Sequence, residues 1–459
     1  MRTGAMRAEE YAGVLIARAA ANTRLNAFLA YEPQAVLEAA RDADARRARG
    51  GKLGALHGLP LPVKDSVNTR ALVTTNGTRA LRGFRPKDDA EVMHRLFAQG
   101  AILFGKTNLH ELSRGWTSNN GAFGAVRNAY DPQHVPGGSS GGSATLVAAR
   151  VAPLAVAEDT WGSIRIPAAW CGTVGFRPTV GRYPNDGIIP LTRGRFDQVG
   201  PVARSVADVA LFDHALTGEP IAQTVALAGR RLGVPLQWLE GLDPELARLT
   251  QRALDAFVDA GAILVHLPLP SLALESADLA STIIACENVA AIEGFLRDEG
   301  AGMTFAEVIS QASPNLRARY EDSPPDRADH ARALGRREEL IAQMRDFFRE
   351  QRLEALVFPP VLAPAPPLGD NAEIVVAGEM VPIRTVVGRN TALGNCARLA
   401  SLVVPVGLTQ SGLPVALELD AASGKDRELL ALGLAVESVL GPLPAPPSVR
   451  DRLAASSEA

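Results

Sequence analysis

Residues 136–170, PGGSSGGSATLVAARVAPLAVAEDTWGSIRIPAAW, contain two glycine-rich segments separated by a short apolar run. Ser139, Ser140 and Ser143 lie in the first segment, Ser163 lies in the second, and the stretch has no histidine. The residues from Ser143 onward are typical of a helix that opens out of the first segment. The arrangement therefore raises the question of which base would activate a serine hydroxyl here.

The segments around this stretch alternate between helical and strand patterns. Residues 8–50 read as helices that end at a Gly-Gly pair, and two apolar runs end at Lys64 and Lys106. The alternation predicts an α/β fold with a largely parallel or mixed sheet. Further helices are expected over residues 205–216, 244–261, 303–350 and 426–441, with strands at residues 353–360 and 401–408.

The chain shows no repeat and no clear boundary, so we expect one domain over residues 1–459. Within it we distinguish N-terminal helices at about residues 8–50, a motif-bearing core at about 56–213, and a substrate-pocket and closing region at about 214–459.

Composition places the chain among ordinary globular proteins, with 47% hydrophobic residues and a formal net charge of −3. Near-neutrality gives no reason to expect nucleic acid or an anionic membrane as a partner. Cys171, Cys286 and Cys396 lack the spacing of a disulfide framework or a zinc site. The N-terminus lacks the apolar core of a signal peptide, and no apolar run approaches a spanning helix. We expect a cytoplasmic protein without a metal or cofactor.

The glycine-serine loop at residues 137–142 allows three interpretations. It could be a tight loop whose serines cap a helix, or a phosphate-binding loop, although it lacks the GK[ST] motif. It also matches the G-x-S-x-G nucleophile elbow, which would make Ser140 the nucleophile. The elbow needs a late histidine, and His214, His266 and His330 do not follow a strand near the C-terminus.

A neutral lysine can replace histidine as the base if burial lowers its pKa, whereas arginine stays charged. Only five of the 47 basic residues are lysines. Two of them, Lys64 and Lys106, end apolar runs, so either could be a base at the end of a strand. The alternative for each is a lysine whose charged end reaches water.

Several motifs resemble those of the amidase signature hydrolases, and they follow one another in the family's order along nearly the whole chain. They include HGLPLPVKDSVNT, AILFGKTNLHEL, VPGGSSGGSA and DTWGSIRIPAAWCGTVGFRPTVGRYP. The resemblance implies a large mixed β-sheet covered on both faces by helices. It also implies a Ser–cis-Ser–Lys triad formed by Ser163 as nucleophile, Ser139 as bridge and Lys64 as base, with a cis peptide bond between Gly138 and Ser139.

Other residues take supporting roles by the same resemblance. Lys106 would be structural, Ser140 would support the site, and Asp159 would pair with Arg165. The backbone N–H groups of Thr160, Trp161, Gly162 and Ser163 would form the oxyanion hole.

The chain departs from the family's usual wording at Ala157, Glu158 and Trp161. A carboxylate beside Lys64 would raise its pKa and oppose a neutral base, so we expect Glu158 to point elsewhere. Trp161 replaces a glycine in the oxyanion loop, and we expect it to form a wall of the acyl pocket rather than pack into the core.

The sequence from residue 171 to 213 looks most like the branch that hydrolyses arylacetamide-type primary amides, so the expected partner is a small-molecule amide. Trp116, Trp161, Ile166 and Cys171 are the expected pocket residues, with residues 270–400 supplying most of the lining. The alternatives are the amidotransferase subunit that makes Gln-tRNA, a fatty-amide hydrolase, or a catalytically silent binding protein. The oligomeric state stays open and includes a homodimer.

Overall fold

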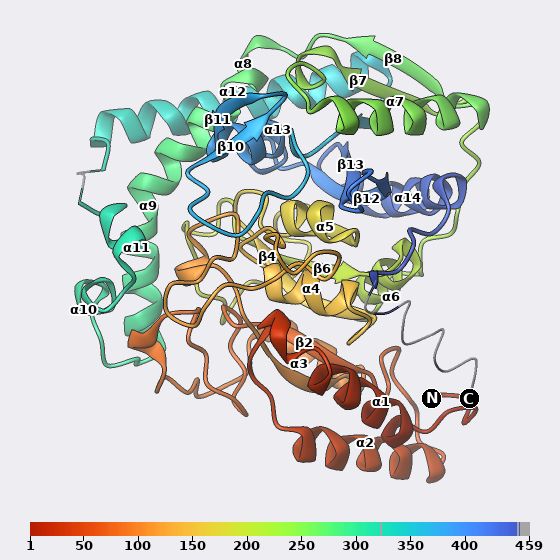
Figure 1. Ribbon diagram of the computed structural model, residues 1–459, viewed down its shortest axis with the longest axis vertical. Coiled ribbons are helices and arrows are strands. Elements are labelled where there is room, and N and C mark those ends of the chain that lie inside the picture. Colours follow the sequence, from red (N-terminus) through yellow and green to blue (C-terminus); the bar gives the residue numbers. More distant parts are fainter. Residues whose placement is uncertain (322–323, 448, 450–459) are drawn as a thin grey trace.

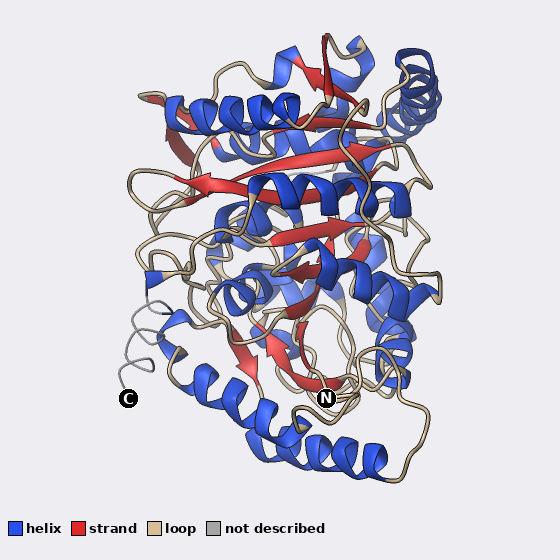
Figure 2. Cartoon of the chain, turned by 90° about the vertical axis from the view of Figure 1, so that its right-hand side faces the viewer, coloured by secondary structure: helices blue, strands red, loops and turns tan. Residues whose placement is uncertain are grey.

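A computed structural model describes residues 1–321, 324–447 and 449. Eleven strands form one mixed sheet in the order β1-β3-β2-β4-β6-β5-β12-β13-β9-β7-β8. The sheet runs along the long axis of the molecule, as Figure 2 shows. Its strands are β1 (Phe28–Ala30), β2 (Pro60–Lys64), β3 (Ile102–Thr107), β4 (Leu154–Asp159), β5 (Val174–Arg177), β6 (Gln198–Ala203), β7 (Arg231–Pro235), β8 (Ile263–Leu267), β9 (Ala355–Phe358), β12 (Ala400–Leu408) and β13 (Pro414–Ala421).

Helices cover both faces of this sheet (Figures 1 and 2). They are α1 (Ala8–Ala20), α2 (Pro33–Ala48), α3 (Glu91–Ala98), α4 (Gly141–Ala148), α5 (Arg165–Cys171), α6 (Val206–Thr217), α7 (Pro244–Asp259), α8 (Ser271–Leu274), α9 (Ser276–Asp298), α10 (Phe305–Ser310), α11 (Pro314–Ala318), α12 (Arg327–Gln351), α13 (Ile383–Cys396) and α14 (Asp426–Leu440). The predicted α/β class, with a large mixed sheet between helices, is confirmed.

Alternation along the central strands explains why helices are needed on both faces. In β12, Leu402 and Val404 join the cluster that contains α6 and α14, whereas Val403 joins the cluster that contains α5. Successive side chains of a strand point to opposite faces, so an apolar run such as SLVVPVGL is stable only when both faces are covered.

Most predicted elements are present. The helices expected at residues 205–216, 244–261 and 426–441 are α6, α7 and α14, and the strand expected at 401–408 lies within β12. The charged segment 303–350 contains α10, α11 and most of α12, and its residues 322–323 lie outside the described residues. A separate hairpin of β10 (Glu373–Val376) and β11 (Glu379–Pro382) was not predicted.

Helix α9 corrects one expectation from composition. By length and hydropathy it is the one described helix that could cross a membrane, and half of that window is buried in the protein. It packs against α12 and α13 and contains the buried polar residues Glu287 and Asn288. Burial of both polar and apolar residues is typical of a helix in a protein core.

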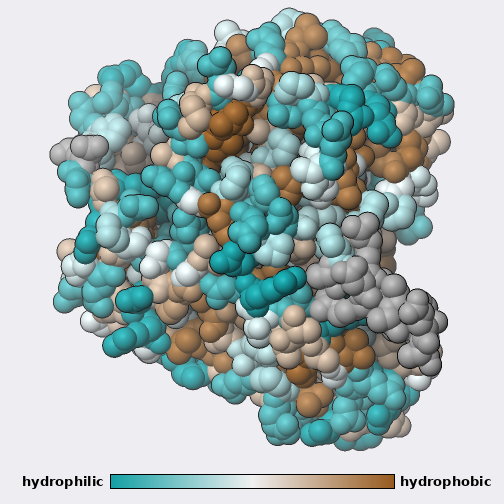
Figure 3. Space-filling view, in the orientation of Figure 1, coloured by the Kyte–Doolittle hydropathy of each residue, from teal (hydrophilic) through white to brown (hydrophobic). Residues whose placement is uncertain are grey.

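Figure 3 shows that hydrophilic residues cover most of one face of the molecule, with hydrophobic residues in separate patches. One patch lies over the β10–β11 hairpin, where Val375 and Met380 are exposed.

Candidate active site

Two neighbouring strands and the loops that follow them position the predicted site. β2 ends at Lys64 and pairs in parallel with β4, which ends at Asp159. Parallel strands point the same way, so their carboxyl ends lie at the same edge of the sheet. The loop from β4 carries Ser163, and the loop before α4 carries Ser139.

Lys64 is fully buried, and its Nζ lies 2.7 Å from Ser139 Oγ. The peptide bond between Gly138 and Ser139 is cis, as the resemblance implied. The Ser139 carbonyl accepts hydrogen bonds from the His110 N–H and the Ser118 hydroxyl, which fix the loop. The sequence-predicted base and bridging serine are therefore in contact.

Ser163 lies beside this pair and at the surface of a cavity. Its carbonyl accepts a hydrogen bond from the Ser140 N–H at 3.3 Å, which joins the two glycine-rich loops. Its own hydroxyl has no hydrogen-bond partner among the described residues, so the direct Ser139–Ser163 hydrogen bond of a relay is not formed here. The hydroxyl is accordingly available to the cavity.

The expectation that Glu158 points away from Lys64 is wrong. Glu158 Oε2 lies 2.8 Å from Lys64 Nζ, and both side chains are buried. A carboxylate buried at the end of β4 is more stable beside a cation or a hydrogen-bond donor than alone, which explains the contact. Burial lowers the pKa of Lys64, and the Glu158 carboxylate opposes that shift.

The loop from Thr160 to Ser163 has two properties of an anion-binding turn. Gly162 has a φ of +82°, and a Cβ there would come within 2.5 Å of the Ile166 side chain, so only glycine fits. The backbone N–H groups of Thr160, Trp161 and Ser163 have no acceptor among the described residues.

Gly162 itself does not fit its predicted role. Its N–H donates to Asp159 Oδ1 at 2.8 Å and is already used, so the predicted set of four amide donors is reduced to three in this structure.

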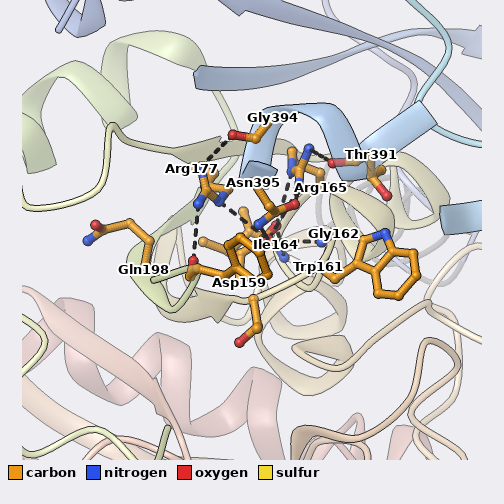
Figure 4. Close-up of polar contacts among 12 residues, drawn as sticks. Asp159, Trp161, Gly162, Ile164, Arg165, Arg177, Gln198, Thr391, Gly394 and Asn395 are labelled. Atoms are coloured by element: carbon orange, nitrogen blue, oxygen red, sulfur yellow. Dashed lines mark hydrogen bonds and ion pairs between the residues drawn. The ribbon is translucent and has the colours of Figure 1, made fainter. Parts of the chain in front are cut away.

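The predicted pair of Asp159 and Arg165 is present and belongs to a larger buried network (Figure 4). Arg165 also contacts Glu418 at 2.7 Å and the Thr391 carbonyl at 2.8 Å, and Arg177 lies 3.6 Å from Asp159. Burial alone would raise the pKa of Asp159, but the two guanidinium groups hold it well below its usual range. Sequence reasoning missed Arg177, Glu418 and Asn395, which come from distant segments.

A cavity of about 400 Å³ opens beside Ser163. Trp116 and Trp161 line it with their rings edge to face, 5.5 Å between centroids. Trp161 is 6% exposed and donates from Nε1 to the Gly388 carbonyl, so it is a cavity wall whose remaining surface is buried. The other lining residues include Ser281, Ile284, Ile383 and three arginines, Arg114, Arg319 and Arg384.

Two of the four predicted pocket residues are not in the cavity wall. Ile166 is buried in the cluster around α5, and Cys171 is buried against Thr145 and the Pro136 carbonyl. Both are enclosed because every residue of this short helix is buried, and the two side chains belong to different core clusters. Residues 270–400 do supply part of the lining, but the sequence offered no signal for Arg114, which lies outside that range.

The surroundings of Lys106 and Ser140 indicate a structural role rather than a catalytic one. Lys106 Nζ is buried and contacts the Val67 carbonyl, Thr74 and Asp65. The Ser140 hydroxyl donates to the Glu158 carbonyl at 3.0 Å. Ser140 therefore stabilises the end of β4 through this hydrogen bond.

Comparison with known proteins matches this sequence and fold to one family of hydrolases. The Amidase family matches residues 12–430, and the chain belongs to it. It is 36% identical to an indoleacetamide hydrolase of Agrobacterium vitis (94% of this chain, 93% of that protein) and 34% identical to a mandelamide hydrolase of Pseudomonas putida (94% and 88%). A solved amidase structure superposes with a TM-score of 0.86 at 32% identity over 96% of this chain and 98% of its own. The protein is therefore an enzyme that acts on amide C–N bonds.

Proposed function

We propose that this amidase hydrolyses small aryl or arylalkyl amides through an acyl-enzyme on Ser163. The observation that carries the proposal is the buried Lys64–Ser139 contact at 2.7 Å, next to a serine that lies at a cavity surface. A base touching a bridging hydroxyl beside a free nucleophile is the arrangement that covalent catalysis by serine requires.

In the proposed reaction, neutral Lys64 accepts the proton of Ser139 while Ser139 accepts the proton of Ser163. The Ser163 Oγ then forms a bond to the amide carbonyl carbon. The relay returns the proton to the leaving nitrogen as the C–N bond breaks. Water attacks the acyl-enzyme by the same route and releases the carboxylic acid.

The unbonded amides of Thr160, Trp161 and Ser163 are the proposed donors to the oxyanion of the tetrahedral intermediate. Fixed amide donors of this kind contribute about 2.7–4 kcal/mol each to the transition state. Gly162 contributes by conformation, since its left-handed φ turns the loop and its own N–H holds Asp159.

Two observations support an aromatic acyl group. Trp116 and Trp161 present ring surface to the cavity beside Ser163. Relatives at 34–36% identity are named for indoleacetamide and mandelamide, which are both arylalkyl amides. The cavity volume of about 400 Å³ is in the range of small-molecule sites.

Ser163→Ala tests the proposal. The variant should lose amide hydrolysis and labelling by a fluorophosphonate probe and keep the wild-type melting temperature, because one cavity-facing hydroxyl contributes little to stability. Ser140→Ala is the matched control from the neighbouring loop and should still be labelled. Labelling that survives in Ser163→Ala and disappears in Ser140→Ala would favour the nucleophile-elbow interpretation instead.

A substrate panel separates the alternatives. Phenylacetamide and indoleacetamide should be turned over faster than glutamine. A preference for glutamine would indicate an amidotransferase-type glutaminase. Failure of every amide, together with absence of labelling, would indicate a silent binding protein.

A further inference from the structure

The Thr160 hydroxyl lies between the carboxyl groups of Glu158 and Asp197. It cannot donate a hydrogen bond to both of them if both carboxyl groups are ionised. Thr160 Oγ1 lies 2.9 Å from Glu158 Oε1 and 2.7 Å from Asp197 Oδ1. A threonine hydroxyl has one hydrogen, so it can donate to only one of these oxygens. Both contacts are hydrogen bonds only if one of the two carboxyls carries a proton.

The surroundings of the two carboxyls identify which one holds the proton. Asp197 accepts hydrogen bonds from the Leu191 N–H, the Thr192 N–H and the Thr192 hydroxyl in addition to Thr160. Burial and the charge of an ionised Glu158 raise the pKa of Asp197, and these four donors oppose that shift. A proton on Glu158 removes its charge, so the four donors then favour the anion of Asp197. Glu158 Oε1 has no hydrogen-bonding neighbour other than Thr160 among the described residues, so a proton on Oε1 would be donated to the Thr160 hydroxyl.

Lys64 fits the same assignment in its neutral form. Its Nζ has three neighbours, Ser139 Oγ at 2.7 Å, Glu158 Oε2 at 2.8 Å and the Glu158 carbonyl at 3.2 Å. A neutral amine donates two hydrogens, here to the two Glu158 oxygens, and accepts one from the Ser139 hydroxyl. Every contact of Lys64 is then satisfied, and the lone pairs of Ser139 Oγ stay available for the proton of Ser163.

We propose that Glu158 stores the proton that Lys64 gives up, so that Lys64 becomes a neutral base without releasing a proton to solvent. This inference rests on the proposed function. In the step, the Lys64–H bond breaks, a proton moves to the Glu158 carboxylate, and an ammonium–carboxylate pair becomes an amine and a carboxylic acid with the same total charge. The carboxylic acid is held by Thr160, which donates in turn to Asp197. Glu158 is thus a positioning residue for the base.

The charged groups that face Lys64 are few. They are Glu158 and Asp159 of β4, and Asp197 just before β6, whose charge also acts on Lys64. The titratable His110 interacts with the charge of Lys64 as well, but burial lowers the pKa of His110 to about 3, so this imidazole is neutral at pH 7. Arg165 and Arg177 neutralise Asp159. The proton is therefore exchanged between Lys64 and Glu158, and Asp197 acts on this pair through Thr160.

NMR of the lysine side chains tests the assignment directly. The chain has five lysines, so protein labelled with ¹³C and ¹⁵N at lysine gives few signals, and Lys64→Met identifies that of Lys64. At neutral pH we expect the Lys64 signal of an amine. Lys106 is the internal control, since its three acceptor neighbours suit an ammonium group. An ammonium signal from Lys64 in the active wild type would overturn the proposal.

The pH dependence of kcat/KM in Glu158→Gln gives a second test, because an ionised and a protonated Glu158 predict different shifts of the acidic limb. If Lys64 must lose its proton to solvent beside an ionised Glu158, removing that carboxylate lowers the pKa of Lys64 and moves the acidic limb to lower pH. If Glu158 stores the proton, Lys64 in the wild type already faces a neutral group, so the limb stays in place or moves to higher pH. A shift to lower pH contradicts the proposal.

Thr160 offers a matched pair of variants. Thr160→Val removes the acceptor of the Glu158 proton and should lower kcat with little change in KM, and Thr160→Ser should lose less. Equal activity in both variants would contradict the chain of hydrogen bonds. If wild type is neither labelled at Ser163 nor active on amides, the proposed function fails, and the NMR result still decides the proton assignment.

A different observation, the charge along the cavity wall, carries a second inference. Arg114, Arg319 and Arg384 line the cavity, and no Asp or Glu does among the described residues. Arg384 pairs with Asp278, whereas Arg114 and Arg319 have no carboxylate partner among the described residues. The Arg114 guanidinium lies over the Tyr320 ring, 5.7 Å from its centroid. Burial lowers the pKa of Arg319, and the nearby charge of Arg114 lowers it further.

We infer that the acyl part of the amide substrate carries an anionic group, such as a carboxylate, that binds between Arg114 and Arg319. Two neighbouring guanidinium groups repel each other unless an anion lies between them, and guanidinium binds carboxylate in a paired geometry. This inference deepens the proposed function by adding a charged group to an aromatic acyl group.

Paired substrates test it. Wild type should prefer a primary amide whose aryl group bears a carboxylate over the same amide bearing a methyl ester. The double variant Arg114→Gln, Arg319→Gln should raise KM for the acid by about tenfold or more, because a hydrogen bond to a charged group is worth about that factor, and should change KM for the ester much less. Arg317→Gln, on the same segment but outside the cavity wall, is the control. Equal rates for acid and ester in wild type would overturn this inference, while loss of all amide turnover would count against the proposed function.

Discussion

At the scale of single residues, Lys64 determines how the enzyme should respond to pH and to substitution. Burial lowers the pKa of Lys64, so its neutral form exists at lower pH than that of a free lysine. In the proposed mechanism the neutral form of Lys64 is the base, so activity should fall as pH drops through the acidic limb of the profile. Lys64→Arg should be as inactive as Lys64→Ala, because arginine keeps its proton. Rates of amide hydrolysis across pH check both statements.

Lys106 provides the control for Lys64, since both lysines are buried next to the carboxyl group of an acidic residue. Lys106→Met should destabilise the protein by about 3–5 kcal/mol, the cost of leaving the Asp65 charge buried and unpaired. The folded fraction of Lys106→Met should still be labelled at Ser163. Substantial activity in Lys64→Arg would exclude Lys64 as the base.

Trp161 combines two roles that the sequence presented as alternatives. Its ring lines the cavity, yet the residue is only 6% exposed, and its Nε1 donates a hydrogen bond to the Gly388 carbonyl. Trp161→Gly should therefore lower the stability by about 3–5 kcal/mol, as truncation of a buried aromatic residue does. It should also improve bulky acyl amides relative to small ones by about tenfold, since contacts of this size give about 1–3 kcal/mol of discrimination. Thermal melts and the ratio of kcat/KM values measure the two effects. A stability loss with an unchanged ratio would remove Trp161 from the acyl pocket.

At the scale of elements, the buried network of Asp159 and Arg165 joins the loop after β4 to α13 and β13. Arg165→Gln should destabilise the protein by about 3–5 kcal/mol at pH 7, because Asp159 and Glu418 lose their main partner. Asp159 has a depressed pKa in the folded state, so its contribution is present above the unfolded value of about 4 and is lost as pH falls through the folded value. The difference between wild type and variant should therefore shrink in acid.

Urea unfolding at pH 7 and in acid measures this difference. Arg95→Gln, which breaks the exposed pair with Glu91, is the control and should cost about 0–1 kcal/mol. A difference for Arg165→Gln that grows in acid would contradict the assigned charge on Asp159.

The elements that could be predicted from the sequence are those with local signals. Helices α6, α7 and α14 follow from apolar periodicity and from end signals such as the Ser205 cap. The assembly of Lys64, Ser139 and Ser163 at one edge followed from motifs whose order along the chain matches a family. The direction of Glu158 could not be predicted, because it depends on Lys64, which contacts Glu158, and on Asp197, which contacts Thr160, and both come from other segments. Arg114, Arg319 and Arg384 were also missed. Arginines are common outside protein cores, so their positions in the sequence do not indicate that they share a cavity.

At the scale of the whole molecule, the order of strands explains why the C-terminal segment is needed. β12 and β13 lie between β5 and β9, so the last hairpin joins the strands β1–β6 to the strands β7–β9. Such pairing is distant in sequence, which is why it could not be read from periodicity. The chain therefore completes its sheet only when residues near 400–421 are in place.

This topology leads to a prediction about cooperativity, which also tests the expected single domain. Leu402 of β12 is fully buried at the junction, and Leu402→Ala should cost about 2–5 kcal/mol. Because β12 connects both parts of the sheet, protection against hydrogen exchange in β4 and in β7 should be lost at the same, lower urea concentration. Leu267→Ala on the edge strand β8 is the control and should weaken protection mainly in β7 and β8. Hydrogen exchange followed by mass spectrometry along a urea series gives both readings. If β4 and β7 lost protection at different urea concentrations in the wild type, the two parts of the sheet would be separate folding units, and the single-domain expectation would be wrong.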